Sequence, residues 1–343
     1  MPNPKLAALI SPERAAEVVD AGTRRLLEER FEVVWAEAGH AAGPAQPGRP
    51  PALDPATLPE LVAGADVLLT SWGTPKLGNE LWADGQGPKV VAHAAGTVKH
   101  LIDPVILDHG VGVFSAGRRI AWSVGEYCLG ALLTLARRLP RFDGAIRSGG
   151  WKQTEYRGHE LAGAKVGIIG ASSTARALIA MLKPFGCDLA VYDPYLSHAH
   201  AQELGVRTTT LEDAARSALL SIHVPNVPET KGMITRELIE TLPDGAVVVN
   251  SSRGPAVDQQ ALLDHALGGR IYAALDVYDP EPSTFDATIL QAPNLLFTPH
   301  IAGDTAEGHL ALAGYVLRDA LQWLADGTRG PSFVEPAAWS ITA

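Results

Sequence analysis

The stretch KVGIIGASSTARALIAMLKPFGCDLAVYD, residues 165–193, decides how this chain folds. Its apolar run up to Gly170 predicts a β-strand, and the segment TARALIAMLKPFG predicts a helix that stops at Gly186. The run DLAVYD predicts a second strand, which ends in Asp193. A strand, a tight turn, a helix and a second strand ending in an acid are the elements of a dinucleotide-binding fold.

The turn GASSTA, residues 170–175, keeps one of the three glycines that such folds commonly carry. Ser172 stands where a second glycine would let the backbone approach a pyrophosphate, and Ala175 is an accepted substitute for the third. The start of the helix still offers free N–H groups to an anion. We therefore expect cofactor contacts from Gly170, Ser172, Ser173 and Thr174. A strand–helix turn without a ligand is the alternative.

Asp193 distinguishes between the two nicotinamide cofactors. It lies 193 − 170 = 23 residues after Gly170, close to the ~20 residues expected for the acid of a dinucleotide fold. A carboxylate at this place would bind both ribose hydroxyls and repel a 2′-phosphate, and the following residues PYLSHAHA contain no arginine. The sequence therefore predicts NAD rather than NADP.

Short apolar runs alternate with helical patterns along the whole chain, which predicts parallel strands joined by crossover helices. The expected strands are residues 6–10, 31–37, 66–72, 89–96, 111–117, 165–170, 188–193, 218–224, 246–252, 271–278 and 294–299. The expected long helices are residues 12–30, 123–148 and 305–327. Ser11 is the expected N-cap of the first helix, with Pro12 at its first position. The proline-rich segment 41–57 is expected to be a loop.

This order predicts an α/β protein with two open, mostly parallel sheets. The length of 343 residues also favours two domains. We place the first domain at residues 1–120 plus 306–343, because the last helical pattern is expected to return to it. The second domain is residues 121–305.

The composition argues against several classes of partner. The formal charge is 28 − 38 = −10, which disfavours nucleic acids and anionic membrane surfaces. No apolar run approaches the ~18 residues that a membrane helix needs. Cys128 and Cys187 lie among apolar residues outside any CxxC pattern, so we expect buried free thiols and a reducing cytoplasm. His198 and His200 lack further obvious ligands, so no metal site is expected.

Polar residues at or just after the carboxyl ends of predicted strands form the candidate site, because open α/β sheets bind ligands there. They are Arg253, Asp276, Glu281 and His300. An arginine can pair with the carboxylate of a 2-oxo acid through two hydrogen bonds. A histidine can give a proton to the ketone oxygen as hydride arrives, and a carboxylate on its other nitrogen orients the ring. Taken alone, an arginine here is more often a surface ion pair, a glutamate a solvated loop residue and a histidine a partly buried polar group. Together in one half of the chain, with a nucleotide turn, they favour hydride transfer.

Several segments resemble the D-isomer-specific 2-hydroxyacid dehydrogenase family, and the resemblance covers nearly the whole chain. They include GHELAGAKVGIIG (158–170), IHVPNVPETKGMI (222–234), NSSRGPAVDQQAL (250–262), LDVYDPEP (275–282) and TPHIAGDTAE (298–307). The resemblance implies that Arg253 binds the substrate and that Glu281 and His300 form the catalytic pair. It also implies further cofactor contacts from Val224, Pro225, Thr230, Ser251, Ser252 and Asp276, the last on the nicotinamide side.

The resemblance implies a flavodoxin-like substrate domain and a Rossmann-type NAD-binding domain, with the active-site cleft between them. The segment AAGTVKH (94–100) aligns with a glycine-rich loop whose amides hold the substrate carboxylate, which makes Gly96 and Thr97 the candidates. Ile120 stands where the formate dehydrogenase branch has Asn, and with Glu281 this argues against that branch.

Two features of the first domain and its following helix leave the substrate and assembly open. Arg118 and Arg119 could bind a second anionic group of the substrate, or could lie exposed beside acidic residues. The apolar face of residues 123–138 suggests a homodimer by analogy with the family.

We therefore expect a cytoplasmic, NAD-dependent oxidoreductase that interconverts a 2-oxo acid and a D-2-hydroxy acid. One alternative is an NAD(H)-responsive binding protein, like the related transcriptional corepressors, which keep the same Arg–Glu–His set. Another is a family member that oxidises a different substrate, such as phosphite. The side chain of the substrate is not predicted.

Overall fold

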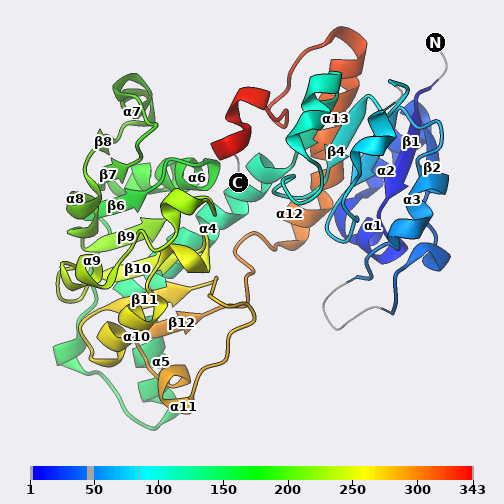
Figure 1. Cartoon of the computed structure of the whole chain (residues 1–343). Coiled ribbons are helices and arrows are strands. Elements are labelled where there is room, and N and C mark those ends of the chain that lie inside the picture. Colours follow the sequence, from blue (N-terminus) through cyan, green and yellow to red (C-terminus); the bar gives the residue numbers. More distant parts are fainter. Residues whose placement is uncertain (1–2, 45–49, 84, 342–343) are drawn as a thin grey trace. The chain divides into compact units, whose positions relative to one another are not determined.

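The computed structural model describes residues 3–44, 50–83 and 85–341 (Figure 1). It divides into two compact units, residues 1–120 with 305–343 (unit 1) and residues 121–304 (unit 2). Each unit is built on one parallel sheet flanked by helices. The predicted α/β fold with two open parallel sheets is confirmed.

Unit 1 has a five-stranded sheet in the order β2-β1-β3-β4-β5, which is the flavodoxin-like order. Its strands are β1 (Lys5–Leu9), β2 (Glu32–Trp35), β3 (Val67–Thr70), β4 (Val90–His93) and β5 (Gly112–Ser115). Its helices are α1 (Pro12–Val18), α2 (Ala21–Arg30), α3 (Leu58–Leu61), α12 (Ala306–Leu310) and α13 (Leu312–Asp326).

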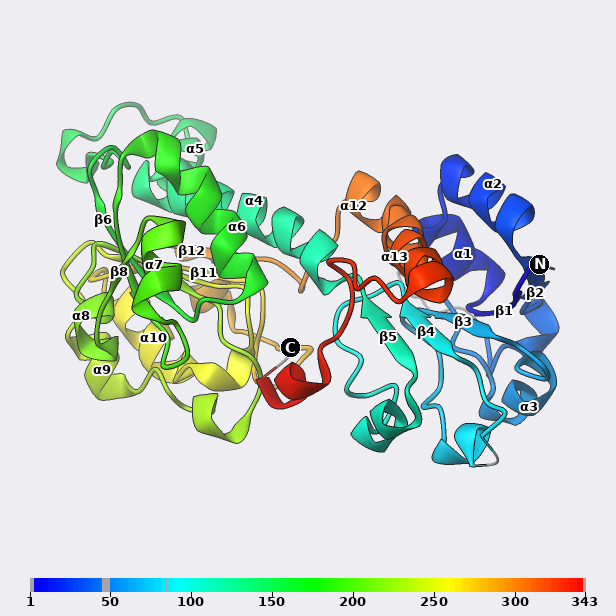
Figure 2. The ribbon, with the colours of Figure 1, turned by 90° about the horizontal axis from the view of Figure 1, so that it is seen from above.

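Apolar side chains cover both faces of this sheet. One buried cluster joins it to α1, α2 and α13, and a second joins the other face to α3 and neighbouring loops. Figure 2 shows α1, α2 and α13 together on one side of the strands and α3 on the other. α1 begins at Pro12 as predicted, because the Ser11 hydroxyl accepts a hydrogen bond from the Arg14 amide.

Unit 2 has a seven-stranded sheet in the order β12-β11-β10-β9-β6-β7-β8. Its strands are β6 (Lys165–Ile169), β7 (Asp188–Tyr192), β8 (Arg207–Thr208), β9 (Leu219–Ile222), β10 (Val247–Asn250), β11 (Tyr272–Leu275) and β12 (Leu295–Phe297). The strand order reverses between β6 and β9, which makes the carboxyl edge at this point the expected place for a nucleotide.

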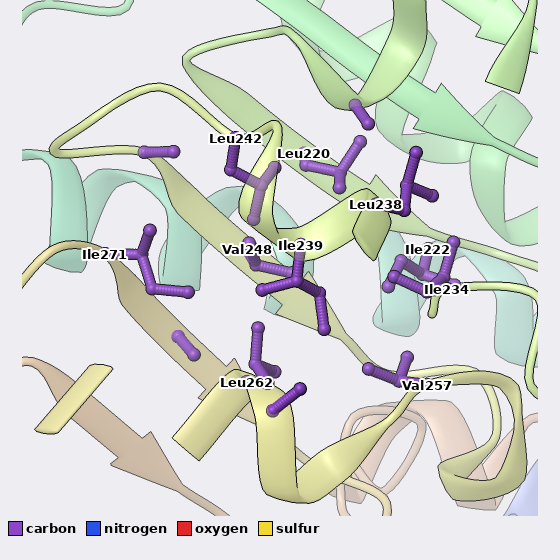
Figure 3. Packing of buried hydrophobic residues seen from close by; sticks show 14 of the residues in the cluster. Leu220, Ile222, Ile234, Leu238, Ile239, Leu242, Val248, Val257, Leu262 and Ile271 are labelled. Carbon is purple, nitrogen blue, oxygen red and sulfur yellow. The ribbon is translucent and has the colours of Figure 1, made fainter. Parts of the chain in front are cut away.

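Helices cover both faces of the unit 2 sheet. They are α4 (Gly117–Ala136, which begins in unit 1), α5 (Leu139–Arg147), α6 (Ser173–Leu182), α7 (His198–Leu204), α8 (Leu211–Ala215), α9 (Arg236–Glu240), α10 (Gln259–Leu267) and α11 (Ala287–Leu290). One buried cluster joins β9, β10 and β11 to α8, α9 and α10. Figure 3 shows Val248 of the sheet beside Ile239 of α9, with Leu262 of α10 close by. This packing fixes the carboxyl ends of the strands, where the candidate residues lie.

The predicted helix 12–30 is wrong as one element. The chain leaves the helical conformation at Val19, and Asp20 caps α2 by accepting a hydrogen bond from the Thr23 amide at 2.6 Å. An aspartate at an N-cap satisfies an otherwise unpaired amide, so it favours a new helix start over a continuous helix.

The predicted helix 123–148 is also two helices, and its start was placed too late. α4 begins at Gly117, and Arg138 adopts a left-handed conformation (φ 59°) between α4 and α5. Pro140 sits in the first turn of α5, where its missing N–H costs nothing but where it cannot continue a preceding helix. The predicted helix 305–327 likewise divides at Ala311 into α12 and α13.

Smaller differences concern loops and thiols. The two-residue strand β8 is absent from the prediction. The expected loop 41–57 contains a short helical turn, Pro55–Thr57, and residues 45–49 lie outside the described chain. Both cysteines are free thiols, but Cys187 is only half-buried rather than buried. In the described part of the chain, no helix is long and apolar enough to cross a membrane.

Candidate active site

Gly170 connects β6 to α6 and is the one position of the turn whose backbone needs glycine. Its φ is +92°, and a Cβ there would lie 2.6 Å from the carbonyl oxygen of His223. Ser172, at the place of the second glycine, is the N-cap of α6 with an ordinary φ of −62°. Ala175, at the place of the third glycine, is fully buried. The departures from the three-glycine pattern therefore require no strained backbone.

Hydroxyl groups line the start of α6. The Ser172 hydroxyl lies 2.9 Å from that of Thr174, which lies 2.9 Å from Nδ1 of His223. The other ring nitrogen of His223 contacts the Ser221 hydroxyl at 2.8 Å. Burial lowers the pKa of His223 to about 3, so its ring is neutral and orients the two hydroxyls. Ser173 is exposed at the same helix end.

The carboxylate of Asp193 holds the turn in place. One oxygen accepts a hydrogen bond from the Ala171 amide and the other from the Tyr195 amide, each at 2.7 Å. Carboxylate oxygens have further lone pairs, so these bonds leave room for ribose hydroxyls. The predicted ribose contact stays a prediction, and the structure adds a role in fastening the turn.

The segment after β9 reaches the glycine turn. Val224 is 7% exposed, and one of its methyl groups would lie 3.3 Å from a Cβ on Gly170. The Thr230 hydroxyl donates to the carbonyl oxygens of Pro225 and Val227 and so closes the loop. The structure thus places Val224 beside the turn and gives Thr230 partners inside its own loop.

Ser251 and Ser252 follow β10 and are almost buried. The Ser251 hydroxyl lies 3.0 Å from the thiol of Cys128 on α4, and the Ser252 hydroxyl donates to the side chain of Asn250. Burial raises the pKa of Cys128 to about 11, so the thiol stays protonated. Both serines therefore have partners within the protein, and their predicted cofactor contacts stay predictions.

Arg253 follows β10 at a place where two loops touch. A Cβ on Gly254 would lie 1.9 Å from the carbonyl oxygen of Tyr278, so only glycine lets the loop after β10 approach the loop after β11. Arg253 donates to the carbonyl oxygen of Ser252 at 2.6 Å. Burial lowers the pKa of Arg253, and the charge of Glu281 opposes that shift. The guanidinium and the Glu281 carboxylate therefore lie within electrostatic reach of each other.

Glu281 and His300 form a hydrogen-bonded pair. Oε2 of Glu281 lies 2.8 Å from Nδ1 of His300, and Oε1 accepts from the Tyr278 amide at 2.9 Å. The side chains of His300 and Glu281 are 54% and 36% exposed. Arg253, Glu281 and His300 follow β10, β11 and β12, which are neighbours in the sheet. The structure thus brings the three predicted residues together at one edge.

Asp276 is fully buried and holds the loop that carries His300. Its carboxylate accepts hydrogen bonds from the Thr298 hydroxyl at 2.7 Å and from the amides of Ile301 and Ala302 at 2.8 Å each. The predicted contact of Asp276 with the nicotinamide stays a prediction.

Comparisons with known proteins show the family to which the chain belongs. Residues 129–302 match the family described as D-isomer specific 2-hydroxyacid dehydrogenase, NAD binding domain. The chain belongs to this family. It is 30% identical over 254 residues to a hydroxypyruvate reductase of Thermotoga maritima, a match that covers 73% of this chain and 82% of that protein.

A longer relative and a solved structure are also similar to the chain. The chain is 32% identical over 320 residues to a D-3-phosphoglycerate dehydrogenase of Mycobacterium bovis, a match that covers 89% of this chain and 58% of that protein. The chain thus spans little more than half the length of that relative. A phosphoglycerate oxidoreductase from Rhizobium etli shares its fold with a TM-score of 0.79, at 23% identity over 96% of this chain and 98% of that one. The cofactor of the family is NAD, as predicted.

Gly96 and Thr97 belong to unit 1, at the carboxyl end of β4. The Ser115 hydroxyl donates to the Gly96 carbonyl oxygen, and the Thr97 hydroxyl accepts from the Lys99 amide at 3.3 Å. Ile120 packs against the buried cluster of the same unit. That this loop binds the substrate carboxylate stays a prediction.

Arg118 and Arg119 occupy the first turn of α4. Arg118 is exposed, and Arg119 is half-buried and donates to the Glu307 carbonyl oxygen at 3.5 Å. These contacts do not distinguish the two predicted alternatives, and both stay open. Among the described residues, no group of three or more His, Cys, Asp or Glu could hold a metal ion.

Sequence reasoning missed two tyrosines of the site. The Tyr278 amide binds Glu281, and its hydroxyl donates to the carbonyl oxygens of Leu275 and Thr298. The Tyr127 hydroxyl on α4 lies 2.6 Å from that of Thr298. Tyr278 lies inside the segment LDVYDPEP, which the sequence analysis had singled out. Its contact with Glu281 is made by the backbone amide, however, and any residue type except proline could make it. Tyr127 is far from Thr298 along the chain, and only the fold joins them.

Proposed function

We propose that this dehydrogenase interconverts a small 2-oxo acid and its D-2-hydroxy acid with NAD(H). The observation that carries the proposal is the Glu281–His300 pair, at 2.8 Å, with the half-buried Arg253 guanidinium in electrostatic reach. A cation, an acid–base group and its orienting carboxylate at one edge of the sheet are what this reaction needs from the protein.

Arg253 binds the substrate carboxylate. Its planar guanidinium can give two parallel hydrogen bonds, which fix the acid in one orientation. Burial strengthens this pairing, because little water competes with it. Gly96 and Thr97 remain the predicted second contact.

His300 exchanges the proton. Because Nδ1 of His300 is hydrogen-bonded to Glu281, Nε2 is the nitrogen available to the reacting oxygen. In reduction the proton moves from Nε2 to the oxygen on C2, and in oxidation it returns to Nε2. Glu281 keeps the ring in the orientation that both directions require.

The residues around Gly170 fit NAD. Glycine at this position lets the loop after β9 approach the turn, because a side chain would collide with the backbone of His223. The turn leads directly into the N-terminus of α6, whose free amides suit a pyrophosphate. Ser172, Ser173 and Thr174 would hold the pyrophosphate, and Asp193 would hold the ribose. When bound, NADH supplies the hydride that reduces C2 of the acid.

The names of the relatives suggest the first substrates to test. The name of the Thermotoga maritima relative suggests hydroxypyruvate. The name of the Mycobacterium bovis relative suggests 3-phosphoglycerate, tested in the oxidative direction. A second anionic group on the substrate would suit Arg118 and Arg119. The homodimer predicted from α4 stays a prediction.

A steady-state screen tests the proposal. NADH oxidation is followed with hydroxypyruvate, glyoxylate, pyruvate and longer 2-oxo acids, and NADH binding is measured by fluorescence. We expect turnover with at least one acid, and His300→Asn should lower kcat by ~10²–10⁴ while the Kd for NADH stays within about twofold. Tight NADH binding without turnover of any acid would support the corepressor-like alternative instead. Turnover that His300→Asn leaves intact would remove His300 from the mechanism.

A further inference from the structure

A chain of hydroxyl groups runs from α4 to the loop that carries His300. The Tyr127 hydroxyl lies 2.6 Å from Oγ1 of Thr298, and Oγ1 lies 2.7 Å from Oδ1 of Asp276. All three residues belong to unit 2. In the part of the chain that the structure describes, the side-chain hydrogen bonds of these three residues do not reach Glu281 or His300, so their relation to catalysis is indirect.

The direction of each hydrogen bond follows from its donors. The Ile301 and Ala302 amides can only donate, so the oxygens of Asp276 accept. Thr298 has one proton and gives it to Asp276, so the Tyr127 hydroxyl donates to Thr298. Burial raises the pKa of Tyr127 well above its usual range, which keeps its proton in place.

The backbone of His300 needs such a support. Its φ is +59°, a left-handed conformation that is strained for a residue with a side chain. Such a conformation persists only when its surroundings fix it. Here Asp276 binds the residue two positions before His300 and the two residues after it. The Tyr278 hydroxyl also donates to the Thr298 carbonyl oxygen.

We propose that Tyr127 and Thr298 are positioning residues, which hold the Asp276 carboxylate and thereby fix the strained backbone and the aim of the His300 imidazole. The proposal rests on the proposed function, because it assigns the network to the proton-transfer step. Tyr127 ties this loop to α4, a helix that begins in unit 1. The network therefore connects α4 and the loop after β12 to the buried carboxylate of Asp276.

Substitutions that remove single hydroxyls test the proposal in the full chain. Tyr127→Phe deletes the first donor, and Thr298→Val replaces a hydroxyl by a methyl group of similar size. We expect kcat to fall about fivefold in the first and about 30-fold in the second, because the second also takes a hydrogen bond from a buried carboxylate. KM for NADH should stay within about twofold, since the cofactor turn is not touched. Thr298→Ser, which keeps the hydroxyl, should recover most of the loss.

The matched control is Tyr156→Phe, which removes the hydroxyl of a tyrosine at the surface beside Arg141. It should leave kcat unchanged. The double variant Tyr127→Phe/Thr298→Val should have the kcat of Thr298→Val alone, because both changes interrupt one chain. Independent effects would multiply instead, and would show that the two hydroxyls do not act together.

A measurement without substrate separates this proposal from the proposed function. Amide hydrogen exchange of Ile301 and Ala302 in the cofactor-free protein should accelerate in Thr298→Val and less in Tyr127→Phe. If the parent protein turns over acids and both variants match its kcat, the positioning role is wrong and the proposed function stands. If the parent protein has no turnover while exchange accelerates as expected, the loop support stands and the proposed function fails. Unchanged exchange in Thr298→Val overturns the support itself.

Discussion

At the scale of single residues, Asp193 combines two roles that one substitution can separate. Its charge is predicted to repel a 2′-phosphate, while its two oxygens accept amides of the glycine turn. Removing the side chain would disturb both at once. Removing only the charge leaves an acceptor oxygen, so an asparagine is the informative replacement.

Asp193→Asn should relax the preference for NADH over NADPH. Two unit charges a few ångströms apart interact by about 4 kcal/mol at an effective dielectric constant of 20, and solvent reduces this value at a surface site. We therefore expect the ratio of kcat/KM for NADPH to kcat/KM for NADH to rise about tenfold, which is 1.4 kcal/mol. Steady-state kinetics with both cofactors measures it.

Asp193→Ala is the comparison variant. It loses the same charge and also both amide contacts, so KM should rise for both cofactors. An Asp193→Asn protein with the parent ratio would show that the ribose is read elsewhere.

The catalytic candidates were visible in the sequence because their chemistry belongs to the side chains. Arg253, Glu281 and His300 follow three strands that the apolar runs had located, and parallel strands place their carboxyl ends at one edge. The supports of these residues were not visible. Tyr127 donates to a threonine far along the chain, and Tyr278 contributes its amide. Contacts of these two kinds depend on the fold rather than on a local pattern.

At the scale of elements, the strands were predicted more reliably than the helix ends. Fully buried strands such as β10 are nearly continuous apolar runs, which makes them visible in the sequence. The helix patterns 12–30 and 123–148 keep their apolar period across a break, so periodicity alone joined them. Asp20 and Pro140, the residues that break them, were present in the sequence.

Gly254 is the element-scale feature that brings two loops together. A Cβ there would lie 1.9 Å from the carbonyl oxygen of Tyr278, and a backbone carbonyl cannot swing aside as a side chain does. Gly254→Ala should therefore lower the free energy of unfolding of the protein by about 2 kcal/mol or more. It should also lower kcat, because the loops after β10 and β11 carry Arg253 and Glu281. Urea denaturation and steady-state kinetics measure the two effects.

Gly130→Ala is the matched control. Gly130 is exposed within α4, and a Cβ there meets nothing within 4 Å. Alanine favours a helix over glycine by ~0.5–1 kcal/mol, so this variant should be slightly more stable than the parent. Equal destabilisation by both substitutions would mean that the close approach at Gly254 does not govern the effect.

At the scale of the whole molecule, a buried neutral histidine lies in each unit. In unit 1, His93 is fully buried, and its Nδ1 lies 3.0 Å from the Thr70 hydroxyl. Burial, with a contribution from the charge of His100, lowers the pKa of His93 to about 3. In unit 2, burial lowers the pKa of His223 to about 3 as well. Both side chains ionise near pH 6.5 once the chain unfolds.

The free energy of unfolding should therefore fall as the pH falls below about 6.5. Between that value and about 3, each histidine is protonated in the unfolded state and neutral in the folded state, so acid stabilises the unfolded state. Each should contribute a slope of about 1.4 kcal/mol per pH unit well below pH 6.5, and none above it. His93→Gln and His223→Gln remove one such group apiece. Each substitution should lower the slope by the amount that corresponds to about one bound proton. Both substitutions also lower the stability at neutral pH, because each removes buried hydrogen bonds.

Urea titrations of the parent and the variants from about pH 7.5 to 5 measure these slopes. His159→Gln, at an exposed position, controls for the exchange of side chain itself. The slope is the informative quantity, because it counts protons and does not depend on how many contacts the glutamine restores. A His223→Gln protein with the slope of the parent would mean that His223 is charged in the folded state. The hydroxyls of Thr174 and Ser221 would then both accept from its ring, and the description of the α6 N-terminus would have to change accordingly.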